Sequence, residues 1–175
     1  EKRVSRMVEA LCKELDVPAE TRGEIASAAL LHDIGKFAIP LDVIQKTAPL
    51  TKEEVALLKT HSAKGREVLS ASDDAFLGVA AELAWTHHER YDGTGYPRGL
   101  KGDAIPLGGR ILTICDIYDA LRQDRPYRRG LSHNKAMDII LIGDDRTRPE
   151  HFAPDVLAAC RGIANKFKTI YDTAT

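Results

Sequence analysis

Apolar residues recur three and four positions apart near the start of the chain, which is the spacing of a helix with one buried face. Pro18 follows the last of these positions, which are Val4, Met7, Val8, Leu11, Cys12 and Leu15. Because the pattern is already under way at the first residues, it predicts a helix that begins upstream of residue 1. A second helix is predicted from about Thr21 into Leu30 and Leu31, and it ends near Gly35.

Capping residues predict where several later helices begin. Thr51 and Glu54 have the spacing of a capping box, and the apolar pattern behind them continues to Leu69 as one helix. Asp73 or Asp74 is the expected N-cap of an apolar helix that runs through Trp85. Ser132 is the expected N-cap of a further helix, and Pro154 is expected in the first turn of another. The remaining predicted helices cover residues 110–121, 132–142 and about 154–171.

Glycine and proline are concentrated between Tyr91 and Pro106, which predicts a long loop with room for one short hairpin. No other stretch alternates apolar and polar residues as a half-buried strand does. The pattern therefore predicts an all-α fold.

The size and charge of the chain limit the number of domains and the kinds of partner that we expect. Its 175 residues suit one domain with a single core. The formal net charge is −1, so binding to a nucleic acid through overall charge is not expected. No apolar run is long enough for a membrane span. Three separated cysteines in apolar helical sequence indicate reduced core thiols and a cytoplasmic protein. They are Cys12, Cys115 and Cys160.

Two carboxylates interrupt the apolar helix predicted at 110–121. Asp116 and Asp119 are three residues apart, so they share one face of that helix. A buried carboxylate is costly unless it is paired or bound to a metal. Taken alone, these residues are equally explained by ion pairs with arginines such as Arg110 or Arg122.

Histidines at predicted helix ends favour metal binding over ion pairing for these carboxylates. The His87-His88 pair and His61 are weak signals separately, because such residues also occur as caps or half-exposed boundary residues. His32 followed directly by Asp33 adds a carboxylate that can bridge two cations. Nitrogen and oxygen donors without thiolate suit Fe, Mn or another first-row ion. Two such ions would activate a water and hold phosphate oxygens, so the residues predict a metal-dependent phosphohydrolase.

An ordered set of motifs indicates which kind of phosphohydrolase this is. The first half is His32-Asp33-Ile34-Gly35-Lys36, Ile39-Pro40, Glu53-Glu54, Lys59-x-His61 and Gly65. The second half is His87-His88-Glu89-Arg90, Asp92-Gly93-x-Gly95-Tyr96-Pro97, Ile105-Pro106, Asp116-Ile117-Tyr118-Asp119 and Asp124-Arg125-Pro126-Tyr127-Arg128. This set resembles the signature of the HD-GYP domain family over residues 1–130, and only loosely beyond.

The resemblance implies an HD-domain helical bundle that hydrolyses cyclic-di-GMP to linear pGpG and in many members to GMP. By the family pattern, Asp33 would bridge two divalent metal ions. One site would be completed by His32 and Asp116, and the other by His61, His87 and His88. Lys36 and Asp119 would lie next to the metal ligands as catalytic residues. A pair between them would orient the attacking hydroxide or supply a proton to the departing oxygen. A solvated cation near a helix end is the alternative for Lys36.

Substrate contacts are expected from two further segments. The Gly95-Tyr96-Pro97 loop, called the GYP loop below, is associated in the family with substrate recognition and with contacts to diguanylate cyclases. The Tyr96 ring could lie against a guanine, although a bland surface loop is the alternative. Arg125 and Arg128 suit phosphate binding, because a guanidinium presents paired donors, and surface ion pairing competes with that role.

The chain departs from the family pattern at its start. Family members commonly carry one more ligand His about three residues before the position of Arg3, which falls just before Glu1. We therefore expect two metals rather than three, a first helix truncated at its N-terminal end, and an upstream receiver or sensor domain. A catalytically weak receptor for the dinucleotide or for a diguanylate cyclase is the main alternative function. An HD phosphohydrolase of nucleoside phosphates is a third possibility, which the GYP loop and the His87-His88 pair argue against.

Overall fold

The computed structural model describes residues 1–124 and 129–173, and over these residues it is built from helices with no strand. The α-helices are α1 Lys2–Glu14, α2 Ala19–Ala28, α3 Leu41–Ile44, α4 Lys52–Lys59, α5 His61–Leu69, α6 Ala75–Thr86, α7 Leu107–Arg122, α8 His133–Leu141, α9 Pro154–Gly162 and α10 Ala164–Thr173. Short 3-10 turns are η1 Ala29–Leu31, η2 Ile34–Ala38, η3 Gly102–Ala104 and η4 Pro149–His151. The all-α prediction is confirmed, and the hairpin allowed for in the long loop does not form.

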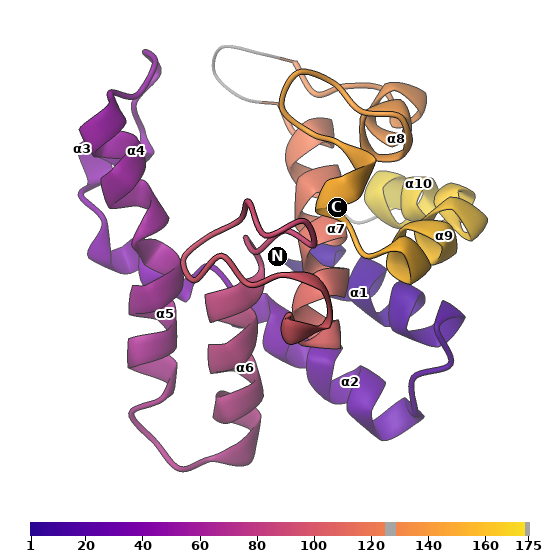
Figure 1. Cartoon of the computed structure of the whole chain (residues 1–175), viewed down its shortest axis with the longest axis horizontal. Helices are drawn as coiled ribbons and strands as arrows, with labels where there is room; N and C mark the ends of the chain where they lie inside the picture. Colours follow the sequence, from indigo (N-terminus) through magenta and orange to yellow (C-terminus); the bar gives the residue numbers. More distant parts are fainter. Residues whose placement is uncertain (125–128, 174–175) are drawn as a thin grey trace.

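The helices form two groups joined by α6 and the long loop (Figure 1). In one group α3 packs on α4 and α4 on α5, while α5 lies alongside α6 and packs on both α6 and η2. In the other group α1 packs on α2 and α7, with α8, α9 and α10 on the far side of α7. The loop after α6 crosses between the groups, so residues from both can meet there.

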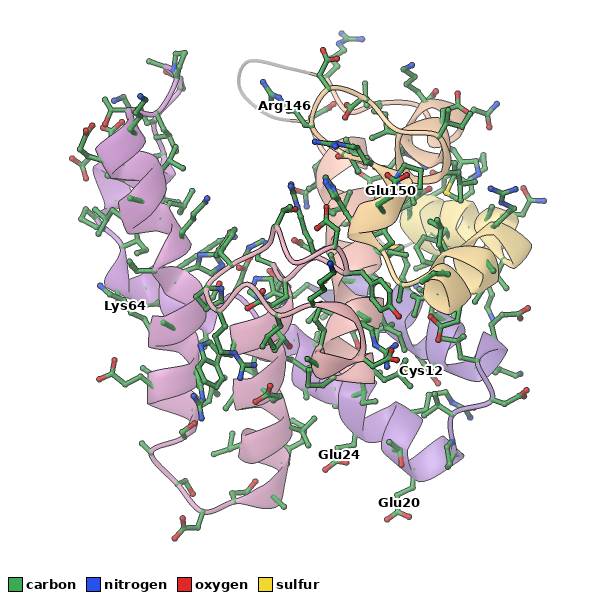
Figure 2. The ribbon with its side chains drawn as sticks, viewed as in Figure 1. Cys12, Glu20, Glu24, Lys64, Arg146 and Glu150 are labelled. Carbon is green, nitrogen blue, oxygen red and sulfur yellow. The ribbon has the colours of Figure 1, made fainter. Side chains whose placement is uncertain are left out.

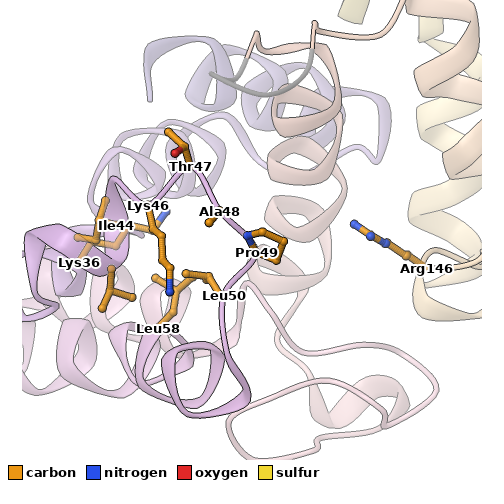
Figure 3. A pocket seen from close by; sticks show the side chains of 10 residues that line it. Lys36, Ile44, Lys46, Thr47, Ala48, Pro49, Leu50, Leu58 and Arg146 are labelled. Atoms are coloured by element: carbon orange, nitrogen blue, oxygen red, sulfur yellow. The ribbon is translucent and has the colours of Figure 1, made fainter.

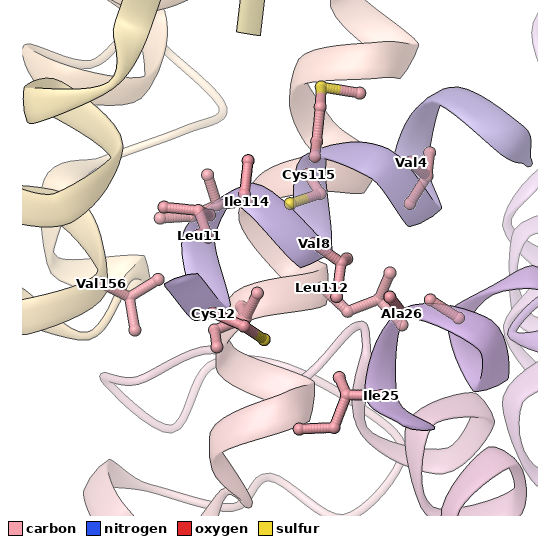
Figure 4. Close-up of a cluster of buried hydrophobic side chains, with 14 of the residues drawn as sticks. Val4, Val8, Leu11, Cys12, Ile25, Ala26, Leu112, Ile114, Cys115 and Val156 are labelled. Atoms are coloured by element: carbon pink, nitrogen blue, oxygen red, sulfur yellow. The ribbon is translucent and has the colours of Figure 1, made fainter. Parts of the chain in front are cut away.

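The main core lies around α1 and α7, because both helices bury more than one face. Val8, Leu11, Leu112 and Ile114 are inaccessible to solvent there, and Val156 of α9 closes one side (Figure 4). Burial of such side chains contributes roughly 1.5–3 kcal/mol each. The metal-site motifs are thus carried on helices fixed by this core. None of the described helices is both long and apolar enough to cross a bilayer.

The three predicted N-caps and the predicted first-turn proline are all present. Thr51 and Glu54 form a reciprocal capping box, Asp74 accepts a hydrogen bond from the amide of Leu77, and Ser132 accepts one from that of Lys135. Pro154 occupies the first turn of α9.

Two helices predicted as continuous are broken. The helix expected from Thr51 to Leu69 ends at Lys59. Both the hydroxyl and the amide of Thr60 donate to the carbonyl of Leu57, at 2.7 and 3.1 Å, so the backbone at this point makes a bond to the third residue back instead of continuing the α-helix. The helix expected over 154–171 breaks after Gly162, a residue of low helix propensity. The first break makes His61 the first residue of α5.

The three cysteines are free and buried, as predicted. Burial raises the pKa of the Cys12 thiol to about 11 and that of the Cys160 thiol to about 12, and it also raises the pKa of the Cys115 thiol well above its ordinary value. Because the thiolate is the nucleophile, we expect native protein at pH 8 to react with an aromatic disulfide reagent at least about a hundredfold more slowly than unfolded protein. Thiol release should be followed by absorbance with and without guanidinium, and fast release from native protein would contradict the burial of these side chains.

Candidate metal centre

The predicted ligands come from four separate segments that meet between the two helix groups. His32 and Asp33 follow η1, where the chain leaves the second helix and tightens into η2. His61 opens α5, the His87-His88 pair follows α6 directly, and Asp116 lies within α7. Helix ends and a buried helix face thus bring the six side chains, predicted from sequence, to one place.

Backbone hydrogen bonds fix the orientation of three histidines. The Nδ1 atom of His32 donates to the carbonyl of Ala29 at 2.7 Å, and that of His61 donates to Leu58 at 2.6 Å. His87 Nδ1 lies 3.0 Å from the carbonyl of Ala84. A carbonyl only accepts, so each Nδ1 carries a proton, and in the neutral ring the Nε2 lone pair is left for another partner. This is the usual arrangement of histidines that bind a metal.

The free nitrogen atoms converge on the carboxylate of Asp33. His61 Nε2 and His87 Nε2 lie 3.3 Å apart, and they lie 3.4 and 3.7 Å from Asp33 Oδ1. The ring of His88 lies 4.0 Å from that of His87 and 5.0 Å from that of His61, measured between centroids. His61, His87 and His88 present ligand atoms within 4.8 Å of one another, which is close enough to surround one ion.

A second group forms on the other oxygen of Asp33. His32 Nε2 lies 3.6 Å from Asp33 Oδ2 and 3.7 Å from Asp116 Oδ1. His32, Asp33 and His87 also present ligand atoms within 4.8 Å of one another. His32 therefore lies on the Oδ2 side of Asp33 and His61 on the Oδ1 side, and His87 is close to both groups.

Two of the buried polar atoms at this site have no hydrogen-bond partner within the part of the chain that the structure describes. They are His32 Nε2 and Asp33 Oδ1, and both point toward the other donors. An unpaired buried polar atom is expensive, by about 1–3 kcal/mol, and is normally satisfied in a native structure. A cation between these atoms would satisfy both, so the residues present fit a metal centre.

Burial and the nearby carboxylates shift the pKa values of the histidines in opposite directions. Burial lowers the pKa of His87 to about 3, and it also lowers the pKa values of His61 and His88. Burial acts on His32 as well, but the carboxylates of Asp116 and Asp33 outweigh it and raise the pKa of His32 to about 9. The same negative field would attract a divalent cation.

Lys36 and Asp119 do not form the predicted pair. The Lys36 ammonium donates to the carboxylate of Asp33 instead. The Asp119 carboxylate accepts from Arg3 at 2.6 and 3.2 Å and from the side-chain Nε2 of Gln123 at 2.8 Å. Although Asp116 and Asp119 are one turn apart, only Asp116 faces the histidines.

The arginines weighed as partners of these carboxylates are also engaged elsewhere. Arg110 pairs with Asp103 at 2.8 Å and Arg122 with Asp172 at 2.9 Å. The arginine that neutralises Asp119 is Arg3 of α1, which sequence reasoning missed. Its partner is 116 positions away, so no local spacing could have revealed the pair.

Glu1 brings the start of α1 beside the same site. Its Oε2 atom lies 3.1 Å from His32 Nδ1, and its side chain is about half exposed.

The GYP loop lies directly over the histidines. The Tyr96 ring stacks on His88 with centroids 4.7 Å apart and planes 28° apart, and the Lys59 ammonium lies 4.9 Å from the Tyr96 centroid. Gly95 permits this closeness, since a Cβ there would lie 2.5 Å from the Cα of Glu89. Pro97 is exposed beside it.

Glu89 anchors the loop and was missed as a functional residue, although it lies inside the quoted motif. Its buried carboxylate accepts hydrogen bonds from the amides of Arg98 at 2.8 Å and Leu100 at 3.0 Å. Trp85 adds a second anchor, because the guanidinium carbons of Arg66 and Arg98 lie 3.3 and 3.5 Å from its ring centroid. Two groups this close to one centroid must lie on opposite faces of the ring.

The remaining predicted substrate contacts, Arg125 and Arg128, lie outside the described residues. The two histidines not assigned to the metal centre have packing roles. His133 bonds the hydroxyl of Tyr118 at 2.8 Å, and buried His151 lies 3.8 Å from Asp92.

Comparison with known proteins agrees with this geometry. The family model described as HD domain matches residues 1–148. A cyclic di-GMP phosphodiesterase of Vibrio cholerae is 43% identical over 148 residues, which are 82% of this chain and 29% of that protein. A 3'3'-cGAMP-specific phosphodiesterase of the same organism is 39% identical over 79% of this chain and 32% of its own length. The chain thus spans about a third of these relatives.

The fold has solved counterparts too. A protein of Bdellovibrio bacteriovorus described as an HDG"Y"P protein superposes with a TM-score of 0.67 over 91% of this chain and 50% of its own, at 22% identity. That similarity establishes the shared helical fold. Taken with the matched family model and the ordered motifs, it places this chain in the HD domain family, within the HD-GYP group.

Proposed function

We propose that this domain is a metal-dependent phosphodiesterase that hydrolyses cyclic-di-GMP to linear pGpG, to GMP, or to both. The observation that carries the proposal is the convergence of histidine Nε2 atoms and two carboxylates on a buried point where His32 Nε2 and Asp33 Oδ1 lack partners. The 43% identical relative named for this activity supports the choice of substrate.

Two metal ions would share the carboxylate of Asp33. His32 and Asp116 would complete the site on its Oδ2 side, where His32 Nε2 lies 3.6 Å from Asp33 Oδ2 and 3.7 Å from Asp116 Oδ1. The other site, on the Oδ1 side, would be completed by His61, His87 and His88. Nitrogen and oxygen donors without thiolate favour Fe or Mn.

When bound, two such ions supply Lewis acidity and an acidified water molecule. In the hydrolysis, the water oxygen forms a new bond to phosphorus, the P–O3′ bond breaks, and the ribose 3′ oxygen takes a proton. Lys36, beside Asp33 at the rim, is placed to neutralise phosphate charge. Asp119 is bound to Arg3 and Gln123, so we assign it to holding α1 against α7 rather than to proton transfer.

The GYP loop would cover the bound dinucleotide on the side opposite the metal ions. Because the face of Tyr96 is stacked on His88, the ring would reach a guanine through its edge or its other side. Exposed Pro97 and Gly99 leave the loop open to a protein partner such as a diguanylate cyclase domain. A weak receptor built on the same contacts is the competing function, and it differs in lacking turnover.

The deciding measurement is hydrolysis of cyclic-di-GMP by purified protein before and after metal removal. We expect chelation to lower kcat by at least about a hundredfold and anaerobic Fe(II) or Mn(II) to restore it, because metal ions supply several kcal/mol of transition-state stabilisation. Cyclic GMP-AMP, assayed in parallel, measures selectivity between the two bases. Stoichiometric metal and tight dinucleotide binding without product would instead support the receptor.

A further inference from the structure

A cleft beside the metal centre has walls from both helix groups. Its volume is about 530 Å³, within the range of small-molecule sites. One wall runs from Lys36 through the α3–α4 connection, with Lys46, Thr47 and Pro49 along it (Figure 3). The other wall is Arg146, whose guanidinium end points across the cleft toward Pro49.

Arg146 belongs to the turn after α8, in the helix group that does not contain Lys64 of α5 (Figure 2). The turn is well braced, because Asp144 Oδ1 accepts from the amides of Arg146 and Thr147 at 2.9 and 2.7 Å. The carbonyl of Arg146 also accepts a long hydrogen bond, 3.5 Å, from Arg90. The backbone is therefore fixed while the side chain extends into the cleft.

The cations that line the cleft differ in what neutralises them. Lys46 contacts both carboxylate oxygens of Glu54 at 2.7 Å, and Lys36 is bound to Asp33. Among the described residues, no carboxylate forms a salt bridge with Arg146. Arg146 is thus the guanidinium still open to an anion on the cleft wall.

A cyclic dinucleotide carries two phosphodiesters, and only one can lie at the metal centre at a time. The second phosphate needs a cation away from the metals, in a space continuous with them. Lys36 borders both the metal centre and the cleft, so the cleft provides that continuity. A guanidinium binds phosphate through paired, charge-assisted hydrogen bonds.

We propose that Arg146 binds the phosphate that is not being cleaved and so selects substrates with two phosphodiesters. This inference rests on the proposed phosphodiesterase function. Arg146 lies outside the motifs that define the family resemblance, and it acts on binding rather than on the reacting bond.

The test compares two substrates in Mn-loaded protein. Cyclic-di-GMP has both phosphates, whereas bis(p-nitrophenyl) phosphate has only the reacting one. We expect Arg146→Ala to raise KM for cyclic-di-GMP about tenfold, as for loss of a hydrogen bond to a charged group, with a much smaller effect on the single diester. Arg146→Lys should recover part of the loss. Arg148→Ala removes an exposed cation of the same turn that does not line the cleft, and it should leave both substrates unaffected.

The outcomes separate the two proposals. Equal KM values for wild type and Arg146→Ala, or equal losses on both substrates, would overturn the role of Arg146 while leaving the phosphodiesterase intact. If wild type binds cyclic-di-GMP without turnover, the phosphodiesterase fails, and the Kd from calorimetry then decides whether Arg146 contributes. Absence of both binding and turnover would refute both.

Discussion

Replacing Asp33 by alanine is expected to lower turnover of cyclic-di-GMP by at least about a thousandfold. Its two oxygens face the two donor groups, Oδ2 toward His32 and Oδ1 toward His61 and His87, so its loss would remove a ligand from both proposed metal sites. Metal ions supply several kcal/mol of transition-state stabilisation, and each 1.36 kcal/mol corresponds to a factor of about ten. The measurement is steady-state hydrolysis together with metal content from mass spectrometry.

Asp42→Ala is the matched control, because Asp42 is exposed on α3 and, among the described residues, its side chain accepts a hydrogen bond only from the adjacent amide of Val43. It should retain wild-type metal content and turnover. If Asp33→Ala kept two metals per chain and full activity, the carboxylate would not be the bridge and the assignment would be wrong. Circular dichroism of both variants separates loss of ligand from loss of fold.

The second large effect is expected at Gly35, where η2 lies against α5. A Cβ there would overlap the carbonyl oxygen of His61 and lie 2.5 Å from the amide nitrogen of Gly65. Both are backbone atoms that cannot rotate away. We therefore expect Gly35→Ala to lower the free energy of unfolding by about 3 kcal/mol and the melting temperature by roughly 6–12 °C.

Gly23→Ala provides the contrast, because Gly23 lies inside α2 and an added Cβ would meet nothing within 4 Å. Alanine there should stabilise the protein by about 0.5–1 kcal/mol, since it favours the helix over the unfolded chain. Calorimetric melting of the two variants measures both effects. A Gly35→Ala variant that melts with wild type would show that η2 and α5 can separate without penalty.

Much of the fold was predictable because its signals are local. The α1 helix follows from the apolar spacing of its residues, and the caps at Thr51, Asp74 and Ser132 follow from residue type. The break at Thr60 was not predictable, because the apolar pattern continues through it while a side-chain hydrogen bond ends the helix. That break starts a new helix at His61, so the error concerned the site itself.

In the candidate site, too, the features with a signal in the sequence were predicted and those that depend on tertiary packing were not. The resemblance to the HD-GYP signature implied that His32, Asp33 and Asp116 are neighbours, and the cost of burying such residues unpaired agreed with it. The partners of the surrounding charges were missed, since they depend on tertiary packing. Arg3 meets Asp119 only because α1 packs on α7, and Arg146 faces the cleft only because the turn after α8 returns to it.

The placement of Trp85 has an optical consequence. It is the single tryptophan of the chain, and its ring is held between Arg66 of α5 and Arg98, which follows the GYP loop. Intrinsic fluorescence excited at the red edge of protein absorption therefore comes from the junction of the loop and the α5–α6 pair. Any ligand or partner that displaces the loop changes the charges above and below the indole. The molecule thus carries a built-in spectroscopic reporter of loop position that needs no label.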